Sequence, residues 1–467
     1  MREACGVAAV SGAKEAANLV FLALYALQHR GQESAGVVSM DSGGRCHVKK
    51  AMGLVADAFD PEVLEGLKGR VAVGHTRYST SGESHQRNAQ PLVVDFRGSP
   101  LVVAHNGTLT NAATLRRSLA RDGSIFQTEV DSETLVHLFA RSRHLDEEGR
   151  VDDALTQVQG AFALVMAIGD TLYAARDARG FRPLVLGRLG EAAVVVSETC
   201  ALDMIGAEFV REIEPGEVVR IRDGKVQSLR PLRPAPRSAC LFELVYFSRP
   251  DSVVWGASVN TARRAFGKQL AKEHPVDADC VVAVPDSANS AALGYSEESG
   301  LPFELALIRN HYVGRTFIQP SQADRDFRVR VKYNPVGSLV EGRRLVVVDD
   351  SLVRGTTSRG LISLLRIAGA EEVHLRIASP PVKFPCYYGI DMPTREELIG
   401  SSRSVEEIAD RLGADSLGYL TMEGMQDAVS DHGPFCTACW SGNYPAPLTD
   451  MDAEEADAMQ LQLDELS

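Results

Sequence analysis

Residues 345–358, with the sequence LVVVDDSLVRGTTS, restrict the fold more than any other part of the chain. Four consecutive apolar residues are typical of a parallel strand that is buried on both faces. A helical pattern over 359–370 follows, with Gly369 near its end. Two further apolar runs, 279–284 and 373–377, flank this unit. Their alternation with helical patterns predicts an α/β domain with a mainly parallel sheet in the second half of the chain.

The acids Asp349 and Asp350 fall at the carboxyl end of this strand, where α/β sheets bind ligands. There they can hold sugar hydroxyls or a magnesium-bridged diphosphate. The small residues after them open a helix whose backbone N–H groups and hydroxyls can hold a phosphate. A pair of acids that only caps the helix is the alternative, but the whole order of residues disfavours it. A Walker phosphate loop is excluded because its Gly-Lys-Ser/Thr sequence is absent.

This segment resembles the diphosphate-sugar motif of type I phosphoribosyltransferases. The resemblance implies contacts to phosphoribosylpyrophosphate (PRPP) from Asp349, Asp350, Ser351, Arg354, Gly355, Thr356, Thr357 and Ser358. Residues 284–287 (VPDS) resemble the pyrophosphate loop of that family, which implies further contacts from Asp286 and Ser287. Ser287, Asp349 and Asp350 match the Mg²⁺ positions of the family, so Mg²⁺ is an expected cofactor.

Residues 312–334 resemble the flexible loop that closes over the substrate in the same family. The basic residues of this loop would screen a pyrophosphate leaving group. They are Arg325, Arg328, Arg330 and Lys332, of which Lys332 is assigned a contact to PRPP. A solvated basic loop is the alternative interpretation for these four.

The first half of the chain has a different pattern, in which short strands alternate with turn dipeptides and a few helices. Strands are predicted at 6–10, 35–40, 70–74, 100–104, 161–168, 171–175 and 192–196, and helices at 14–28, 111–121 and 132–142. This pattern predicts an antiparallel, layered α+β domain. Residues 229–237 (LRPLRPAPR) have the composition of a stiff linker. The boundary between the two domains is therefore predicted after residue 230.

Cys5-Gly6-Val7 opens the first predicted strand, and a Cys there is by itself most often a small core residue. Four other segments change that interpretation. They are 27–36 (LQHRGQESAG), 74–78 (GHTRY), 105–107 (HNG) and 131–133 (DSE). In this order and spacing they resemble the glutaminase domain of the N-terminal-nucleophile amidotransferases. The resemblance implies an α+β sandwich with the layer order αββα.

The same resemblance implies how an amide would be hydrolysed. Cys5 would be the nucleophile, with its own α-amine as the base. Asn106 and the N–H of Gly107 would stabilise the oxyanion. This mechanism requires Cys5 to be the first residue, whereas four residues precede it here. Residues 1–4 are therefore predicted to be a propeptide that is cleaved between Ala4 and Cys5.

Four more residues match positions that bind glutamine in these enzymes. Arg77 would clamp the α-carboxylate, which suits a planar bidentate donor. Asp131 would hold the α-amino group, and Arg30 and Gly31 would line the pocket. The neighbouring histidines are interpreted as structural hydrogen-bonding residues of strand ends, namely His29, His75 and His105.

The eight cysteines of this long chain are not read as disulfides. Four of them, Cys240, Cys386, Cys436 and Cys439, match the [4Fe–4S] ligands in the iron–sulfur subgroup of the glutamine PRPP amidotransferases. A structural zinc site is the alternative, since four thiolates suit either metal group. Packing in the interior is expected for the remaining cysteines, Cys46, Cys200 and Cys280.

Together, the two sets of motifs run from about residue 5 to residue 444 and resemble the glutamine PRPP amidotransferase family. The domains expected are a propeptide (1–4), a glutaminase domain (5–230), a phosphoribosyltransferase domain with the cluster (231–445) and an acidic tail (446–467). The family's reaction moves ammonia from glutamine to PRPP and gives 5-phosphoribosylamine, the first step of purine synthesis. Purine nucleotides as inhibitors and a homotetramer are also implied by the resemblance.

A PRPP-sensing regulatory protein without turnover is the alternative of another class. Such a repressor would need a basic DNA-binding domain, and this chain carries a net charge of −13. No nucleic-acid partner is therefore expected. The longest apolar run, 18–27, is too short to cross a bilayer and no signal-peptide cleavage site follows it. A cytoplasmic protein without a membrane partner is predicted.

Overall fold

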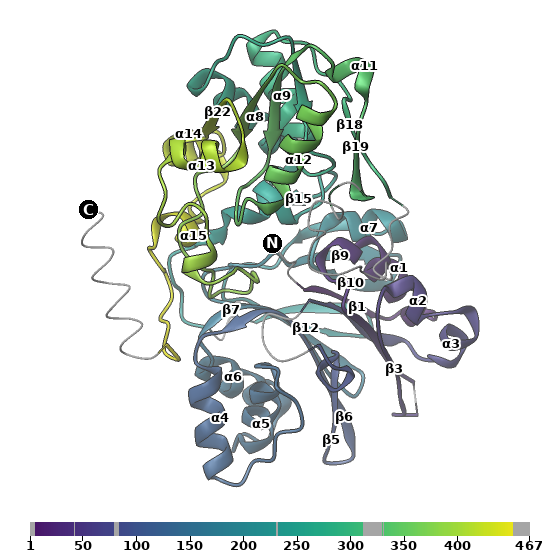
Figure 1. Cartoon of the computed structure of the whole chain (residues 1–467). Coiled ribbons are helices and arrows are strands. Elements are labelled where there is room, and N and C mark those ends of the chain that lie inside the picture. Colours follow the sequence, from purple (N-terminus) through teal and green to yellow (C-terminus); the bar gives the residue numbers. More distant parts are fainter. Residues whose placement is uncertain are drawn as a thin grey trace.

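A computed structural model describes residues 5–41, 43–78, 84–229, 232–311, 329 and 331–451. It contains two packed halves, with the first half of the chain at the bottom of Figure 1 and the second half at the top. The predicted propeptide and the predicted domain boundary at 230/231 lie outside the described residues. So do residues 312–328 and 330 of the predicted closing loop.

The first half is built from two antiparallel sheets. One has the strand order β11-β9-β10-β1-β4-β2-β3. Its strands are β1 (Gly6–Ser11), β2 (Ser34–Met40), β3 (Cys46–Met52), β4 (Val71–Arg77), β9 (Val185–Leu189), β10 (Ala192–Val196) and β11 (Glu208–Glu212). The other has the order β13-β12-β8-β7-β6-β5. Its strands are β5 (Leu92–Phe96), β6 (Ser99–Leu109), β7 (Gly160–Ile168), β8 (Thr171–Arg176), β12 (Val218–Arg222) and β13 (Lys225–Leu229).

Alternate residues of these strands pack between the sheets, and the others face helices. Val7 and Ala9 of β1, for example, lie in the core between the two sheets, whereas Ala8 and Val10 pack against helices. The outer face of the first sheet is covered by α1 (Ala16–Ala26) and α7 (Thr199–Ile205). That of the second sheet is covered by α4 (Ala112–Arg121), α5 (Glu133–Arg141) and α6 (Glu147–Gln157). The predicted αββα layer order is confirmed.

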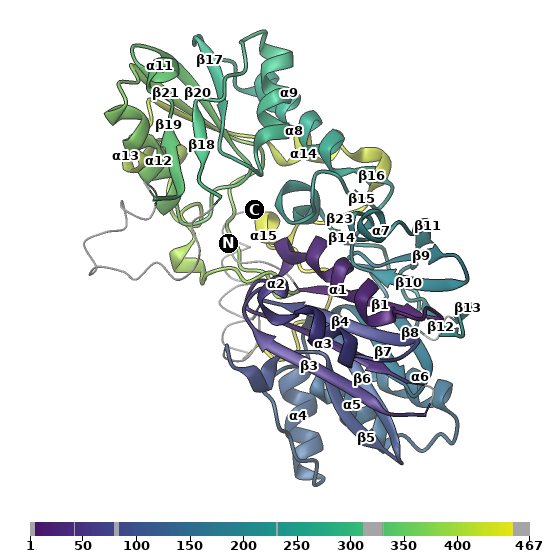
Figure 2. The ribbon, with the colours of Figure 1, turned by 90° about the vertical axis from the view of Figure 1, so that its right-hand side faces the viewer.

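The second half has a parallel sheet of four strands in the order β17-β20-β21-β22. They are β17 (Cys280–Ala283), β20 (Arg344–Asp349), β21 (Glu372–Ile377) and β22 (Ser416–Tyr419). Val346 and Val348 of β20 face α8 (Val259–Glu273) and α9 (Asn289–Ser299), whereas Leu345 and Val347 face α12 (Thr356–Ile367) and α13 (Val405–Leu412). The four apolar residues in a row are thus buried on both faces, as predicted. Figure 2 shows helices on either side of this sheet.

Helix α12 begins at Thr356, three residues before its predicted start. Gly355 has a left-handed backbone (φ 74°) that turns the chain into the helix. Thr356 and Thr357 are exposed, so the first turn carries no apolar residue that a periodic pattern could detect. The helix ends at Ile367, close to Gly369, which again has a positive φ.

The start of the predicted acidic tail is part of the packed structure. Ala446 is buried beside Phe181 and Tyr388, and the Tyr388 hydroxyl donates to the Ala446 carbonyl at 2.7 Å. Residues 446–451 continue along the first half, down the left side of Figure 1. The Asp450 carboxylate accepts hydrogen bonds from the N–H groups of Ala113 (2.6 Å) and Thr114 (2.9 Å). Residues 446–451 are too few to show a periodic pattern from which this docking could be predicted. Residues 452–467 lie outside the described part.

Among the described residues, no helix is both long and apolar enough to cross a membrane.

Substitution of Asp450 by Ala is expected to loosen α4, because two N–H groups of its first turn lose their acceptor. The loss of a helix cap costs about 1 kcal/mol. Amide hydrogen exchange in α4 should therefore become roughly fivefold faster if that turn opens locally. Asp450→Asn is the matched control, since its side-chain oxygen still accepts. Unchanged exchange in Asp450→Ala would show that the cap is unimportant.

Candidate active sites

Cys5 lies directly before β1, at the edge of the core between the two antiparallel sheets. The next residue, Gly6, is paired with Thr76 of β4, so the chain brings Cys5 beside the end of that strand. The Cys5 side chain is 7% exposed, and its thiol lies 3.4 Å from the Tyr78 carbonyl. The predicted nucleophile is thus almost completely buried next to the 74–78 segment.

The electrostatic surroundings of Cys5 include three charged residues predicted for this site. Burial raises the pKa of the Cys5 thiol, and the negative charge of Asp131 acts in the same direction. The positive charges of Arg77 and Arg30 oppose that increase. A thiol with a raised pKa is mostly protonated at neutral pH, so it needs a nearby base before it can attack.

The predicted oxyanion-hole residues lie on β6. Asn106 is completely buried, and neither its amide nitrogen nor its carbonyl oxygen has a hydrogen-bond partner among the described residues. A buried amide without a partner is costly and is usually explained by a ligand, a water or an ion. Gly107 has φ 136°, and a Cβ there would lie 2.1 Å from the Ala161 carbonyl oxygen. Only glycine fits this position, which explains the His-Asn-Gly sequence physically.

Arg77 and Gly31 touch through their backbones, and the charge of Arg77 acts on Cys5. Arg77 is 2% exposed at the end of β4, and its guanidinium lies 3.6 Å from a Glu33 carboxylate oxygen. A Cβ on Gly31 would lie 2.7 Å from the carbonyl carbons of Thr76 and Arg77. The absence of a side chain at Gly31 therefore lets the two segments of the predicted glutamine pocket touch.

Asp131 is held in its ionised form at the end of β6. Its carboxylate accepts from the N–H groups of Leu109 and Ser132, both at 2.8 Å, and lies 3.4 Å from His105 Nδ1. Burial alone would raise the pKa of Asp131, but His105 and these N–H groups outweigh it and lower the pKa. An ionised carboxylate suits the predicted contact to the α-amino group of glutamine. His75 is structural, since burial lowers its pKa to about 3 and its Nε2 contacts the His105 carbonyl at 3.0 Å.

The Arg30 side chain has a different setting from the one predicted. Its Nε donates to the Cys5 carbonyl at 3.0 Å, and its two terminal nitrogens bond to Glu198 (2.5 Å) and Glu243 (2.6 Å). The guanidinium is thus engaged in a buried ion network. Glu198 and Glu243 belong to none of the motifs, and no sequence signal identified them.

In the second half, Ser287 and the two acids come together at the carboxyl ends of β17 and β20. Asp349 and Asp350 are both buried. The hydroxyls of Ser287 and Ser351 donate to the two Asp350 oxygens, each at 2.5 Å, and the Asp350 N–H donates to Asp349. Burial and the charge of Asp350 raise the pKa of Asp349 well above its ordinary value, and Lys332 acts against this increase. Adjacent carboxylates with a hydroxyl form an all-oxygen donor set, of the type that Mg²⁺ binds.

The segment after these acids forms an open loop at the start of α12. Thr356 and Thr357 are exposed there, so their N–H groups and hydroxyls are accessible to a ligand, whereas Ser358 is buried. Arg354 pairs with Glu397 at 2.9 Å. Asp286 pairs with Arg309 at 2.7 Å. These last two predicted PRPP residues are therefore paired with other side chains.

The four cysteines predicted as cluster ligands also come together, although they are distant in the sequence. Cys240 and Cys436 are register partners in the parallel strands β14 (Ala239–Cys240) and β23 (Phe435–Cys436). Cys386 packs in the same clusters as the other three. All four are free thiols, and burial followed by the neighbouring thiols raises the pKa of Cys439. The other described cysteines lie elsewhere, Cys46 on β3, Cys200 on α7 and Cys280 on β17.

The arrangement of the thiols bears on which metal group they fit. Within the described ranges, no three His, Cys, Asp or Glu side chains are placed to surround a single ion. A tetrahedral zinc site has Zn–S bonds of about 2.3 Å, so its sulfurs lie roughly 3.8 Å apart. A cluster with four irons keeps its thiolates at four corners and farther apart. Four free thiols grouped in this way could be the ligands of a [4Fe–4S] cluster or of a structural zinc ion.

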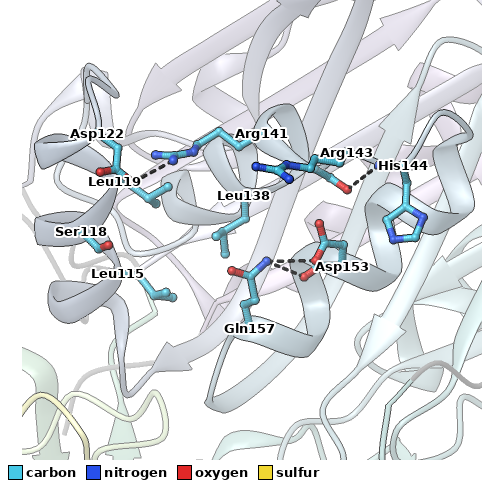
Figure 3. A pocket seen from close by; sticks show the side chains of 11 residues that line it. Leu115, Ser118, Leu119, Asp122, Leu138, Arg141, Arg143, His144, Asp153 and Gln157 are labelled. Atoms are coloured by element: carbon cyan, nitrogen blue, oxygen red, sulfur yellow. Dashed lines mark hydrogen bonds and ion pairs between the residues drawn. The ribbon is translucent and has the colours of Figure 1, made fainter.

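A hollow of about 520 Å³ lies among α4, α5 and α6, away from both candidate sites (Figure 3). The Arg141–Asp122 ion pair (2.8 Å) lies at its rim, and Gln157 donates to Asp153. None of the predicted site residues lines it. A smaller cavity of about 190 Å³ borders Asp286 and Arg309. Asp286 belongs to the predicted pyrophosphate loop, residues 284–287.

Comparison with known proteins places both halves in one family. Residues 75–204 match the family described as glutamine amidotransferase domain. Amidophosphoribosyltransferase 2 of Arabidopsis thaliana, a chloroplastic protein, is 50% identical over 453 residues, covering 96% of this chain and 80% of the relative. Amidophosphoribosyltransferase of Bacillus subtilis is 47% identical over 455 residues, covering 96% and 95%.

Solved structures extend the match to three dimensions. The glutamine PRPP amidotransferase of B. subtilis, complexed with ADP and GMP, has a TM-score of 0.91 and 46% identity and covers 97% of this chain and 100% of its own. A structure described as the allosteric regulatory enzyme of purine biosynthesis also has a TM-score of 0.91, with 47% identity and coverage of 95% and 97%. The chain is an enzyme that belongs to the amidophosphoribosyltransferase family, the glutamine-dependent phosphoribosyltransferases of purine biosynthesis.

Proposed function

We propose that Cys5 releases ammonia from glutamine and that the ammonia is used at the acid pair of β20 to form 5-phosphoribosylamine from PRPP. The observation that carries this assignment is the buried amide of Asn106, which has no hydrogen-bond partner among the described residues. A buried amide without a partner in the protein is usually explained by a ligand, a water or an ion. The tetrahedral oxyanion of an amide under attack is such a ligand.

In the glutaminase reaction, the α-amine of Cys5 takes the thiol proton once residues 1–4 have been removed. The thiolate attacks the glutamine amide carbon, and Asn106 Nδ2 and the Gly107 N–H donate to the oxyanion. The tetrahedral intermediate then collapses, and its C–N bond breaks as the α-ammonium gives its proton to the leaving nitrogen. Ammonia departs, and the glutamyl group remains on the Cys5 sulfur as a thioester. Water then hydrolyses the thioester to glutamate. Arg77 and Asp131 hold the α-carboxylate and the α-amino group throughout.

In the transferase reaction, Asp349, Asp350 and Ser287 would hold Mg²⁺, which when bound neutralises charge on the diphosphate. The loop before α12, from Gly355 to Ser358, would bind the 5-phosphate through its N–H groups and hydroxyls. Lys332, whose charge acts on the Asp349 carboxyl, would contact the pyrophosphate. Ammonia attacks C1 of the ribose, and pyrophosphate leaves.

Ammonia would pass between the sites through a dry internal passage, because protonation in water would remove its nucleophilicity. Closure of the 312–334 loop would exclude water from the ribose site and complete the glutaminase site. Most of that loop lies outside the described residues.

Cys240, Cys386, Cys436 and Cys439 would hold one [4Fe–4S] cluster with a structural role. Support comes from four free thiols grouped where residues 239–240, 386 and 436–439 meet. Purine nucleotides are proposed as inhibitors, since a relative's structure contains ADP and GMP. A homotetramer in the cytoplasm completes the proposal.

Replacement of Cys5 by Ala should abolish glutamine-dependent synthesis, by at least about 10³-fold, because the nucleophile is lost. Synthesis with added ammonium salt should stay within about twofold, since no atom of Cys5 enters the transferase step. Both rates can be measured by pyrophosphate release. The assignment fails if glutamine hydrolysis survives in this variant.

Intact mass will report whether residues 1–4 are removed. Protein that retains them should be inactive toward glutamine and active with ammonia. Full glutaminase activity with residues 1–4 still attached would rule out the α-amine as the base.

Asp349→Asn should weaken Mg²⁺-dependent PRPP binding at least about tenfold, since it removes one of two cation-binding carboxylates. In the native protein, binding should weaken as the pH falls through the raised pKa of Asp349, above the ordinary value of about 3.9. A raised carboxyl pKa means that burying the ionised form destabilises the fold at neutral pH. The ligand-free variant should therefore be more thermally stable than the native protein.

Asp277→Asn is the matched control, because Asp277 is an exposed acid of the same half that pairs with Arg344. Titration calorimetry with and without Mg²⁺, and thermal melts without ligand, measure both effects. Equal PRPP affinity in Asp349→Asn and Asp277→Asn would exclude Asp349 as a ligand of the metal.

Anaerobically purified protein should contain about four iron and four sulfide ions per chain. Cys436→Ser should lose both, together with visible absorption, whereas Cys46→Ser should keep them because Cys46 lies on β3, outside the thiol group. A content of one zinc ion and no sulfide per chain would contradict the cluster assignment and show a structural zinc site instead.

A further inference from the structure

A network of four charged side chains is buried where the two halves meet. It consists of Arg30, Arg182 and Glu198 from the first half and Glu243 from the short π-helix η3 (Glu243–Phe247) of the second. The side chains of all four have no exposed surface. Two arginines balance two glutamates, which suits charges removed from water. The proposed reaction steps use none of these four side chains.

Glu243 joins the two arginines. Its Oε1 accepts from Arg30 at 2.6 Å and from Arg182 at 3.1 Å. Its Oε2 accepts from Arg30 at 2.9 Å and from the Ser248 hydroxyl at 2.8 Å. A single residue of the second half therefore supplies the negative charge that both arginines share.

Each arginine also holds a backbone that borders the glutaminase site. Arg30 Nε donates to the Cys5 carbonyl at 3.0 Å. Arg182 donates to the Tyr388 carbonyl from Nε (3.1 Å) and from a terminal nitrogen (2.9 Å). The residue after Tyr388 is Gly389, which touches the oxyanion-hole glycine. A Cβ on Gly389 would lie 2.7 Å from the Gly107 Cα.

The network is also connected toward the PRPP site. Arg263 on α8 donates to the carbonyl of Leu244 within η3 (2.9 Å) and to that of Ser248 directly after it (2.8 Å). Arg263 lies near enough to Asp350 for its charge to favour that carboxylate. Arg263 thus holds the η3 segment that carries Glu243 and also interacts electrostatically with Asp350 of the acid pair.

We propose that Glu243 is a positioning residue of the glutaminase: through Arg30 and Arg182 it fixes the Cys5 backbone and the contact of Gly389 with Gly107. The nucleophile and the oxyanion hole then hold their relative positions only while the second half is docked. The inference rests on the proposed role of Cys5. Glutamine binding itself depends on Arg77 and Asp131, which lie outside the network.

The test compares Glu243→Gln with Glu217→Gln in the full chain. Glu217 is a matched control, because it is also a buried glutamate with a bidentate arginine partner, Arg211 (2.8 Å for both bonds), and its described contacts include no site residue. Glutamine hydrolysis, ammonia-dependent synthesis and thermal unfolding are measured for each. Glu243→Gln should lower kcat for glutamine by at least about tenfold and change KM by less than about threefold.

Ammonia-dependent synthesis by Glu243→Gln should stay within about twofold of the native rate, which a general loss of structure would not allow. Arg182→Lys is the second variant, for use if Glu243→Gln fails to fold. It keeps the buried charge but loses the planar fork that reaches both Glu243 and the Tyr388 carbonyl. A decrease of severalfold in kcat for glutamine, again with KM little changed, is expected.

A kcat for glutamine within twofold of native in both variants would overturn the proposal, as would an equal decrease in the ammonia-dependent rate. Cys5→Ala is measured in parallel. Continued hydrolysis by Cys5→Ala would overturn the assigned nucleophile and the positioning role together. An inactive Cys5→Ala beside a fully active Glu243→Gln would overturn the positioning role alone.

Discussion

The cost of removing charge from water is the constraint on which the arrangement of this molecule depends. Arg30, Arg77 and Arg182 are among the largest fully buried side chains. A buried charge destabilises a protein strongly unless a partner and hydrogen bonds compensate it. Glu198 and Glu243 compensate Arg30 at the junction of the two halves, and the Arg30–Glu243 pair joins one half to the other. Packing of apolar surface alone would tolerate sliding of one half on the other.

The same constraint separates residues with partners from residues prepared for ligands. Asp131 is ionised because His105 and two N–H groups compensate its burial. Asp349 lacks compensation of that strength, so its pKa is raised. Asn106 has a buried amide without a partner in the described part of the chain. Asp349 and Asn106 lie in different halves. At Asp349 a bound ligand would supply the missing positive charge, and at Asn106 it would supply the missing hydrogen-bond partner.

The sequence predicted the local structure and the short-range chemistry well. Four apolar residues followed by two acids predicted the buried strand β20 with the acids at its carboxyl end. Long-range pairing was beyond it, because Glu243 meets Arg30 across 213 positions and nothing in its neighbourhood indicates a buried charge. The docking of residues 446–451 was missed for the same reason. The composition identifies an acidic segment, but it does not identify the start of α4, whose N–H groups donate to Asp450.

The segment that ends at Asp450 also changes what counts as a domain in this chain. A fragment cut at the linker would contain every glutaminase motif, yet its α4 would lack the Asp450 carboxylate at the first turn. It would also lack Glu243 and the glycine that rests on Gly107. The first half is thus contiguous in sequence but incomplete as a folding unit. With the role proposed for Glu243, glutaminase activity depends on the whole polypeptide, which ties the production of ammonia to the presence of the half that consumes it.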